Sequence, residues 1–420
     1  MREPKLNRRQ FSKGVFAGGA ALLTAREVWP SNDPLVSTDE ISNDKFDLLI
    51  KGGTVVDPHQ NLRGIFDVAV KAGRIVKVSP DIPESQASQV FFAKDRIVTP
   101  GLIDLHVHCF DGIGAGMNAD HYCLRRGVTT VVDAGSAGYP MIGGFLKYVV
   151  NTSVTRIFPL VDIGALGTVI GIRQHPMENL EWVNAQLTSK AAVMNKPVVV
   201  GIKVRLQKSI EGSRDLECLT RALEAAKLSN LPLMVHIDDP ASPLPDIVKM
   251  LRKGDVFTHF LNNHEHSILD ANQKILPEVL EARDRGVIFD VAEGSSHMSF
   301  DVAEKCLAQN FFPDTISTDL YNGNVFGPTY DLPTLASKFL ALGMSLDKVI
   351  ELVTIKPANV FDYGTQLGTL KPGSEADISI FEIQEGRYEY TDADRRKLTG
   401  KQLLVSKAVV RRGQLFLNAN

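Results

Sequence analysis

The sequence predicts an α/β fold: a (β/α)8 TIM barrel with a small flanking β-sandwich built from both chain ends. Eight apolar, strand-like runs recur through the middle of the chain at intervals of roughly 25–40 residues, the size of one βα unit. Helical stretches fill the intervals, and short alternating runs precede and follow the series. The eight runs are residues 101–108, 127–135, 156–164, 198–206, 231–237, 255–260, 286–292 and 314–320.

The barrel is expected over residues 99–360, because eight βα units in about 260 residues match the usual size of this fold. Its clearest helices are expected at 216–230 and 331–353. A doubly wound open sheet is the alternative, but no glycine-rich phosphate loop follows the first strand. Short apolar runs separated by glycine turns predict the two halves of the sandwich, at 46–98 and 361–420.

The composition is that of a globular protein. The chain has 420 residues, of which 44% are hydrophobic and 23% charged, and these proportions exclude a disordered or repetitive protein. Its formal net charge of -3 provides no broad basic surface, so no nucleic-acid partner is expected. Its four cysteines are scattered singly, which predicts neither a disulfide scaffold nor a thiolate zinc site.

Residues 1–30 are predicted to be a twin-arginine-type signal peptide. The pair Arg8-Arg9 and the nearby Phe11 precede the apolar run at 14–25. That run is too short to span a bilayer, which takes about 20 residues, but it suits the apolar region of a signal peptide. We therefore expect an exported, periplasmic protein with no membrane contact in its mature form.

Potential metal ligands lie at the carboxyl ends of the expected strands, where the active sites of (β/α)8 barrels are built. His106 and His108 are two residues apart on the first strand, so both side chains face the same side of the sheet. A lone histidine in an apolar strand is usually a core residue, but four more strand ends also carry a polar residue, and the joint pattern predicts a metal site. His264 and His266 are alternatives to His259, although the THFLN context favours His259. The four later residues are Lys203, His236, His259 and Asp319.

These residues, in the contexts PGLIDLHVH, GIKVR, MVHI, THFLN and PDTISTDL, resemble the motifs of the amidohydrolase superfamily. The resemblance is greatest to its deacetylase branch, which is related to the dihydroorotases, and it covers nearly the whole chain after residue 46. It implies two divalent metal ions, usually Zn2+, bridged by Lys203 after CO2 has converted the amine to a carbamate. The implied ligands are His106, His108 and Asp319 for one ion, and His236 and His259 for the other.

The chemistry of such a site explains the residue types. Neutral imidazole and carboxylate are suitable ligands for a divalent ion, whereas a protonated lysine is not. Because a partly desolvated lysine beside two cations has a lowered pKa, Lys203 is expected to add CO2 as a free amine. The ions would lower the pKa of a bridging water and polarise a substrate carbonyl. Asp319 would be the catalytic residue that takes the water's proton and passes it to the leaving group.

Arg205 and Glu293 are the expected substrate-binding residues. Arg205 shares the parity of Lys203 and has a guanidinium suited to an anionic substrate group, although an ion pair within the barrel explains it equally well. Glu293 precedes Gly294 where the deacetylase relatives typically carry a His-Gly element, so the carboxylate is expected to alter the substrate pocket. Phe110 stands where a dihydroorotase would carry an arginine for the substrate carboxylate, which counts against that activity.

The sequence therefore predicts a binuclear metal-dependent hydrolase that cleaves an amide, as a deacetylase does, or an ester in a small acylated molecule. One alternative is a cyclic-amide hydrolase of the dihydroorotase or dihydropyrimidinase type. Another is a non-catalytic scaffold with the same fold, which should have lost some ligands, whereas all six are present here. A homo-oligomer is compatible with the sequence.

Overall fold

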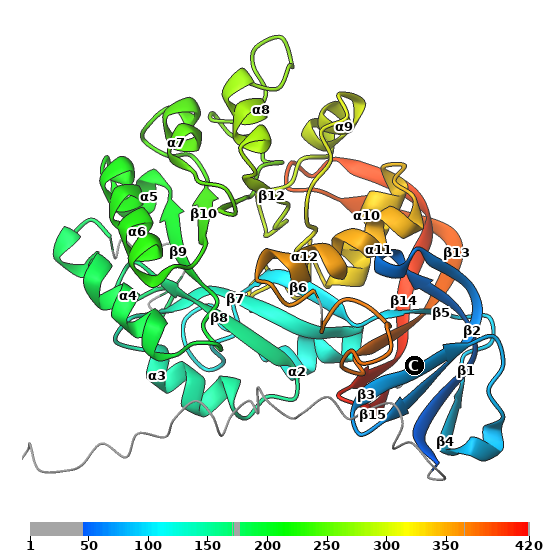
Figure 1. Ribbon diagram of the computed structural model, residues 1–420. Helices are drawn as coiled ribbons and strands as arrows, with labels where there is room; N and C mark the ends of the chain where they lie inside the picture. Colours follow the sequence, from blue (N-terminus) through cyan, green and yellow to red (C-terminus); the bar gives the residue numbers. More distant parts are fainter. Residues whose placement is uncertain (1–44, 170, 172–176, 365, 419–420) are drawn as a thin grey trace, which may run out of the picture. The chain divides into compact units, whose positions relative to one another are not determined.

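The computed structural model describes residues 45–169, 171, 177–364 and 366–418. The predicted signal peptide at 1–30 lies outside these residues. Within the described ranges, no helix is both long enough and apolar enough to cross a membrane. Two sheets organise this part of the chain: a parallel sheet from the middle of the sequence and a mixed sheet from its two ends (Figure 1).

The parallel sheet has seven strands in the order β12-β11-β10-β9-β8-β7-β6, so each strand lies beside its neighbours in sequence. An extended segment takes the eighth position and makes parallel bridges to both edges, from Thr315 to Asp290 and from Leu320 to Val107. These bridges close the sheet and confirm the predicted (β/α)8 barrel. The strands are β6 (Leu102–Val107), β7 (Val128–Gly138), β8 (Arg156–Asp162), β9 (Gly201–Leu206), β10 (Leu233–Ile237), β11 (Val256–Thr258) and β12 (Ile288–Asp290).

Strands β6 to β10 are buried along their whole length. Their sequences are mostly apolar because parallel strands are covered on both faces. Inside the barrel Leu160, Met234 and Val256 belong to one apolar cluster with Ala358 and Leu367. Each of these three strand residues precedes a polar residue by two positions, so it lies on the same face one layer lower. The apolar core therefore supports the polar strand ends.

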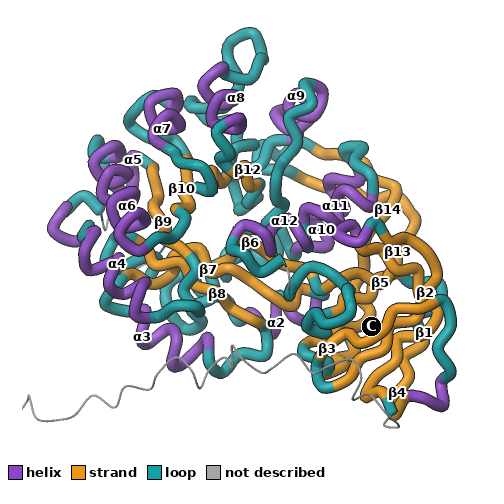
Figure 2. The backbone as a smooth tube through the Cα atoms, in the orientation of Figure 1, coloured by secondary structure: helices purple, strands orange, loops and turns teal. Residues whose placement is uncertain are grey.

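Helices α3 to α9 lie outside strands β7 to β12 (Figure 2). The helix expected at 216–230 is α6, but the one expected at 331–353 is two helices, α10 and α11. The chain turns between them at Gly343, whose φ of 94° favours glycine, and Ser345 caps the second helix. The helices are α2 (Ala119–Tyr122), α3 (Ile142–Phe145), α4 (Ala185–Met194), α5 (Lys208–Glu211), α6 (Asp215–Ser229), α7 (Leu244–Met250), α8 (Pro277–Asp284), α9 (Phe300–Ala308), α10 (Leu332–Ala341), α11 (Leu346–Leu352) and α12 (Ile355–Val360).

The mixed sheet has eight strands in the order β15-β14-β13-β5-β1-β2-β3, with β4 paired to β1. Its two halves join where β5 pairs antiparallel with β13, so strands from both chain ends share one core, as predicted. Figure 1 shows the blue N-terminal strands beside the red C-terminal ones. The strands are β1 (Phe46–Asp57), β2 (Leu62–Lys71), β3 (Arg74–Ser79), β4 (Ala87–Phe92), β5 (Ile97–Pro100), β13 (Ile378–Thr391), β14 (Lys397–Arg411) and β15 (Gln414–Leu417).

Candidate metal centre

The polar residues predicted at the strand ends converge in the structure. His106 Nε2 lies 3.2 Å from Lys203 Nζ and 3.4 Å from Asp319 Oδ1, and His108 Nε2 lies 3.4 Å from the same oxygen. The His259 ring centroid is 5.0 Å from that of His106. These side chains come from four different strand ends and are almost completely buried. The barrel therefore brings together residues that are up to about 200 positions apart in sequence.

His236, the remaining predicted ligand, comes from the end of β10. Its ring centroid lies 4.2 Å from that of His259. Two of the residues in this group have an unusual backbone conformation: φ is 72° at His259 and 51° at Asp319. Such left-handed conformations are costly for residues other than glycine, and they tend to be retained where they aim a functional side chain.

Hydrogen bonds fix the orientation of the His106 ring. Thr258 Oγ1 donates to Asp290 Oδ2 at 3.0 Å and therefore accepts from His106 Nδ1, also at 3.0 Å. Asp290 is held in turn by the hydroxyls of Thr315 and Ser317. With its proton on Nδ1, His106 presents the lone pair of Nε2 to the centre of the site, which is the arrangement typical of metal-binding histidines.

His108 and His259 are oriented in the same way. His108 Nδ1 lies 3.1 Å from Ser136 Oγ, which donates to Asp133 Oδ2 at 2.7 Å, so the hydroxyl accepts from the imidazole. His259 Nδ1 donates to the main-chain carbonyl of Ala292 at 2.7 Å. In both rings Nε2 is left with its lone pair. His259 Nε2 is buried and has no hydrogen-bond partner within the described residues.

This donor set fits divalent cations. Burial lowers the pKa values of His106, His236 and His259 well below the usual range, so these imidazoles are neutral and can act as ligands. The lone pairs of His106 Nε2 and the oxygens of Asp319 face each other although both are acceptors, and a cation between such atoms would stabilise them. Among the described residues, three groups have ligand atoms close enough to share an ion: the buried sets His106, His259 and Asp319, and His236, Asp238 and His297, and the less buried set Asp239, Glu265 and His266.

Lys203 is completely buried, and burial lowers the pKa of its amine to about 7. Close packing against β7 fixes its side chain. A Cβ at Gly135 would lie 2.8 Å from both Cβ and Cγ of Lys203, and the φ of Gly135 is 86°. Gly135 is therefore required both by its backbone conformation and by the approach of Lys203.

Asp319 is ionised in this environment. Burial alone would raise the pKa of its carboxyl group, but the surrounding imidazoles of His108 and His259 outweigh burial and lower the pKa. An ionised carboxylate can bind a cation and can also accept a proton, which are the two roles that the sequence predicts for it.

Asp238 and His297 also line the site, although the sequence analysis assigned no role to either. His297 Nε2 lies 3.0 Å from Asp238 Oδ2, and His264 Nδ1 contacts Asp238 Oδ1. Burial raises the pKa of Asp238, but these two hydrogen bonds outweigh it and hold the pKa well below the ordinary value. Asp238 could have been found from the sequence, since it follows His236 by two positions and shares its face. His297 lies in a loop, where no periodicity applies.

The two predicted substrate-binding residues have different surroundings. Arg205 is buried in β9, its Nη2 lies 3.5 Å from the Gly167 carbonyl oxygen, and burial lowers the pKa of its guanidinium. Glu293 is also buried and forms an ion pair with Lys338 on α10. Lys338 Nζ donates in addition to the carbonyl oxygens of Pro328 and Thr391, at 3.0 Å each. The Glu293–Lys338 pair thus joins the loop after β12 to α10 and to the end of β13.

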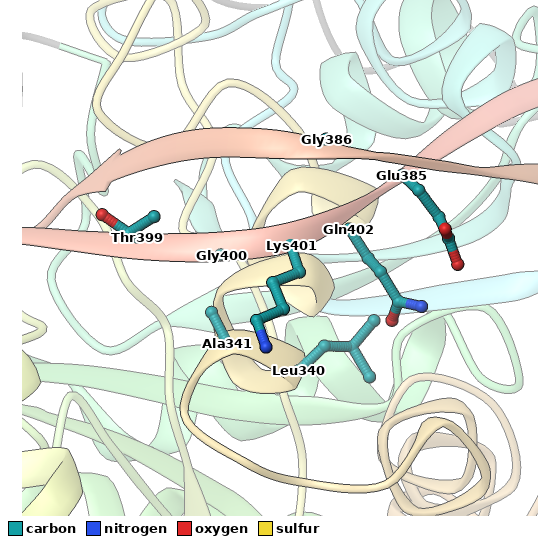
Figure 3. Close-up of a pocket in the computed structure, with 8 residues that line it drawn as sticks. All are labelled: Leu340, Ala341, Glu385, Gly386, Thr399, Gly400, Lys401 and Gln402. Carbon is teal, nitrogen blue, oxygen red and sulfur yellow. The ribbon is translucent and has the colours of Figure 1, made fainter.

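A surface hollow of about 560 Å3 lies elsewhere, between α10 and the β13–β14 hairpin. Figure 3 shows Leu340 and Ala341 of α10 on one side and residues of the two strands, including Lys401 and Gln402, on the other. None of the residues that line it belongs to the group of histidines and carboxylates described above.

A (β/α)8 barrel that gathers buried histidines, carboxylates and a lysine at its strand ends is typical of metal-dependent hydrolases. Residues 97–404 match the amidohydrolase family. The chain therefore belongs to the amidohydrolase family, whose members hydrolyse carbon–nitrogen bonds and generally use a binuclear divalent metal centre. This confirms the predicted family, fold and class of enzyme.

Curated relatives include a deacetylase of Enterococcus faecalis, which is 34% identical over 89% of this chain and all of its own length. A deacetylase of Agrobacterium fabrum is 30% identical over 77% of this chain and 79% of its own. A dihydroorotase of Aquifex aeolicus is 25% identical over 80% of this chain and 89% of its own length. Among solved structures, one described as an adenine deaminase has a TM-score of 0.83 at 34% identity, covering 89% of this chain and all of that one.

Proposed function

We propose that this protein is a binuclear, zinc-type deacetylase that hydrolyses the amide bond of a small N-acyl substrate. The convergence of neutral, pre-oriented imidazoles with Lys203 and Asp319 supports this proposal. When bound, the metal ions would polarise the acyl carbonyl and lower the pKa of a nearby water. The residues proposed to hold one ion are His106, His108 and Asp319, and those proposed for the other are His236 and His259.

Lys203 is proposed to bridge the two ions as a carbamate. Its buried amine has a pKa of about 7, so a substantial neutral fraction is available near neutral pH. The neutral nitrogen adds to CO2 and loses one proton, which yields a carbamate with two oxygens. Lys203→Ala is expected to lose metal and activity, since the methyl side chain of alanine has no oxygen with which to bridge the ions. Bicarbonate or a short carboxylic acid should restore part of both. A fully active, fully metallated alanine variant would refute the carbamate.

Asp319 is proposed to move the proton. It accepts a proton from the attacking water and delivers it to the leaving nitrogen, which would otherwise depart as an unstable anion. The two oxygens of the carboxylate face different neighbours: Oδ1 faces His106 and His108, whereas Oδ2 faces His297. This division supports a role both in holding an ion and in handling protons.

An acyclic amide is favoured over a cyclic one. Three curated relatives at 30% identity or more are named deacetylases, whereas the dihydroorotase of Aquifex aeolicus is 25% identical. Phe110, at the position expected to be arginine in a dihydroorotase, is buried and stacks on Phe145 with ring centroids 4.7 Å apart. An aromatic pair offers no cation to a substrate carboxylate.

The decisive experiment combines metal analysis with a substrate screen. Purified protein is expected to contain about two divalent ions per chain and to hydrolyse N-acyl amino acids faster than dihydroorotate or hydantoins. One ion or none in fully active protein would contradict the binuclear centre. Preferential hydrolysis of cyclic imides would favour the cyclic-amide hydrolase instead, and metal-free, inactive protein would favour the non-catalytic scaffold.

Export by the twin-arginine route is proposed on the sequence of residues 1–30 alone. That route carries folded proteins, which suits a site whose ligands are far apart in sequence and can bind metal only after the barrel has closed. Replacing Arg8 and Arg9 by lysine should retain the protein in the cytoplasm when cells are fractionated. Undiminished mature protein in the periplasm would disprove this route.

A further inference from the structure

His297 is a buried imidazole that the proposed ligand set leaves unused. Its side chain is about nine-tenths buried, and Nε2 lies 3.0 Å from Asp238 Oδ2. An ionised carboxylate only accepts hydrogen bonds, so Nε2 carries the proton and Nδ1 presents a lone pair. Nδ1 is buried, and no other described residue forms a hydrogen bond with it. His264 contacts the second oxygen of Asp238 and fixes the carboxylate from the other side.

The lone pair of His297 Nδ1 faces the proton-carrying residue of the site. Asp319 Oδ2 lies 3.7 Å away and is also an acceptor. Gly294 packs closely against both atoms, because a Cβ there would lie 2.6 Å from His297 Nδ1 and 2.7 Å from Asp319 Oδ2 and would displace them. Leaving two buried acceptors unpaired so close together is costly, and either a cation or a hydrogen-bond donor between them would relieve that cost.

We infer that this donor is the N–H of a secondary amide, and that His297 makes the enzyme selective for such amides. The inference rests on the proposed function and narrows its substrate class. After cleavage the leaving amine carries two hydrogens on nitrogen, one already present in the amide and one received as a proton. Two acceptors, His297 Nδ1 and Asp319 Oδ2, match these two hydrogens. An ester oxygen carries no hydrogen and leaves His297 Nδ1 unpaired.

The reaction balances without any change in the protonation of His297. The oxygen of a water adds to the acyl carbon, and the carbon–nitrogen bond breaks with its electron pair going to nitrogen. The proton lost by the water passes through Asp319 to that nitrogen. His297 holds the existing N–H throughout, and by doing so it keeps the nitrogen lone pair directed at Asp319. The products are a carboxylic acid and a primary amine.

The test uses three matched compounds on the holoenzyme, built on the amino acid that gives the highest kcat/KM in the substrate screen. They are the N-acetyl amino acid, its N-methyl derivative without the N–H, and the O-acetyl hydroxy acid with the same side chain. His297→Phe is expected to lower kcat/KM for the N–H compound by about 10- to 100-fold. The other two compounds should change by less than about threefold, because they never engage His297.

Two further variants serve as controls. His297→Gln keeps an acceptor oxygen at the position and should recover part of the preference for the N–H compound. His121→Phe makes the same change at an exposed histidine on α2 and should leave all three rates unchanged. Equal losses for all three compounds in His297→Phe, or a wild type that cleaves only the ester, would overturn the inference and leave the proposed hydrolase intact. A wild type that cleaves none of them contradicts the proposed function itself.

A second measurement needs no substrate. Long-range 1H–15N correlation spectra of the zinc-loaded enzyme report which ring nitrogen of a histidine carries the proton. The His297 signals, identified by their loss in His297→Gln, should show the Nε2–H form with an unprotonated Nδ1. A ring protonated on Nδ1 would overturn the inference, because it could not accept the amide hydrogen.

Discussion

His259 and His297 lie side by side, with ring centroids 4.1 Å apart, but the protein holds the two rings by different means. His259 directly follows β11, and its Nδ1 donates to a main-chain carbonyl. His297 belongs to the loop after β12, and a side chain, Asp238, holds its Nε2. The loop is anchored in turn by the Glu293–Lys338 pair. The backbone of the barrel therefore orients His259, whereas buried side-chain pairs hold His297 and its loop.

This difference separates two kinds of sensitivity. A residue on the backbone-held side can be replaced without loosening its neighbours, because the strand ladder keeps its position. On the side held by side chains, the loss of one charged partner leaves the other buried and unpaired, which is more costly than the loss of a neutral contact. Substitutions on the first side should mainly affect chemistry and metal binding, and those on the second should also affect folding.

Asp319→Asn should have the largest effect, and on activity alone. The amide retains the shape of the carboxylate but removes both the proton carrier and a charged ligand, so kcat/KM should fall by at least about 1000-fold. Circular dichroism and the unfolding midpoint should stay close to wild type. Asp284→Asn, at an exposed position of α8, is the matched control. Turnover near the wild-type level would show that another group carries the proton.

Lys338→Met tests the loop after β12, which the buried Glu293–Lys338 pair holds in place. It leaves the Glu293 carboxylate buried without its cation, and the free energy of unfolding should fall by about 3–5 kcal/mol in denaturant titrations. Combining it with Glu293→Gln should recover part of that loss, because the second change removes the unpaired charge. Additive losses in the double variant would mean that the two residues do not act as a pair.

The same contrast explains which parts of the site the sequence could predict. His106, Lys203 and His259 follow from two rules, the two-residue period of a strand and the position of barrel sites at strand ends. His297 depends on Asp238, 59 positions earlier in the chain, and no local pattern connects the two. The ion pair of Glu293 could not be predicted either, because its partner Lys338 lies 45 positions away on a helix, where a lysine is usually exposed.

The fold, too, could not be predicted completely from local patterns, and the exception is the break between α10 and α11. The barrel strands could be predicted because apolar runs at regular intervals specify them directly, and both chain ends carried the alternation expected for the mixed sheet. The break between α10 and α11 was missed because the apolar periodicity continues across it. Gly343 and Ser345 carried the signal, since one favours a left-handed backbone and the other caps a helix.

Thr258→Val should have a smaller effect, confined to metal affinity. The variant keeps the shape of β11 but removes the acceptor for His106 Nδ1. Competition with a chelator should show metal binding weakened by about 10- to 100-fold, the usual effect of losing such a partner. Thr315→Val, which also removes a hydrogen bond to Asp290 but does not contact His106, should change affinity by less than about threefold. Equal effects of both variants would mean that Asp290, rather than the orientation of His106, controls affinity.

Glu211→Gln should have the smallest effect on activity, and its effect on stability should depend on pH. Glu211 ends α5, in the loop after β9, and its carboxyl group is almost completely buried. Burial raises its pKa from the ordinary 4.5 to about 8, so the folded protein binds a proton that the unfolded chain releases between these values. The stability due to this proton is complete below about pH 4.5 and is lost as the pH rises through 8.

The glutamine variant has no such proton to lose. Its free energy of unfolding should equal that of the wild type at pH 4.5, exceed it increasingly as the pH rises towards 8, and stay higher by a constant amount at pH 9, about 1.4 kcal/mol for each unit by which burial raises the pKa. Glu217→Gln, an exposed change on the adjacent α6, is the control for removing a negative charge. Parallel stability curves for Glu211→Gln and the wild type would mean that Glu211 stays ionised when buried. In that case a nearby cation must compensate the charge of Glu211. The loop after β9 would then be held by a charged pair, as the loop after β12 is held by Glu293 and Lys338.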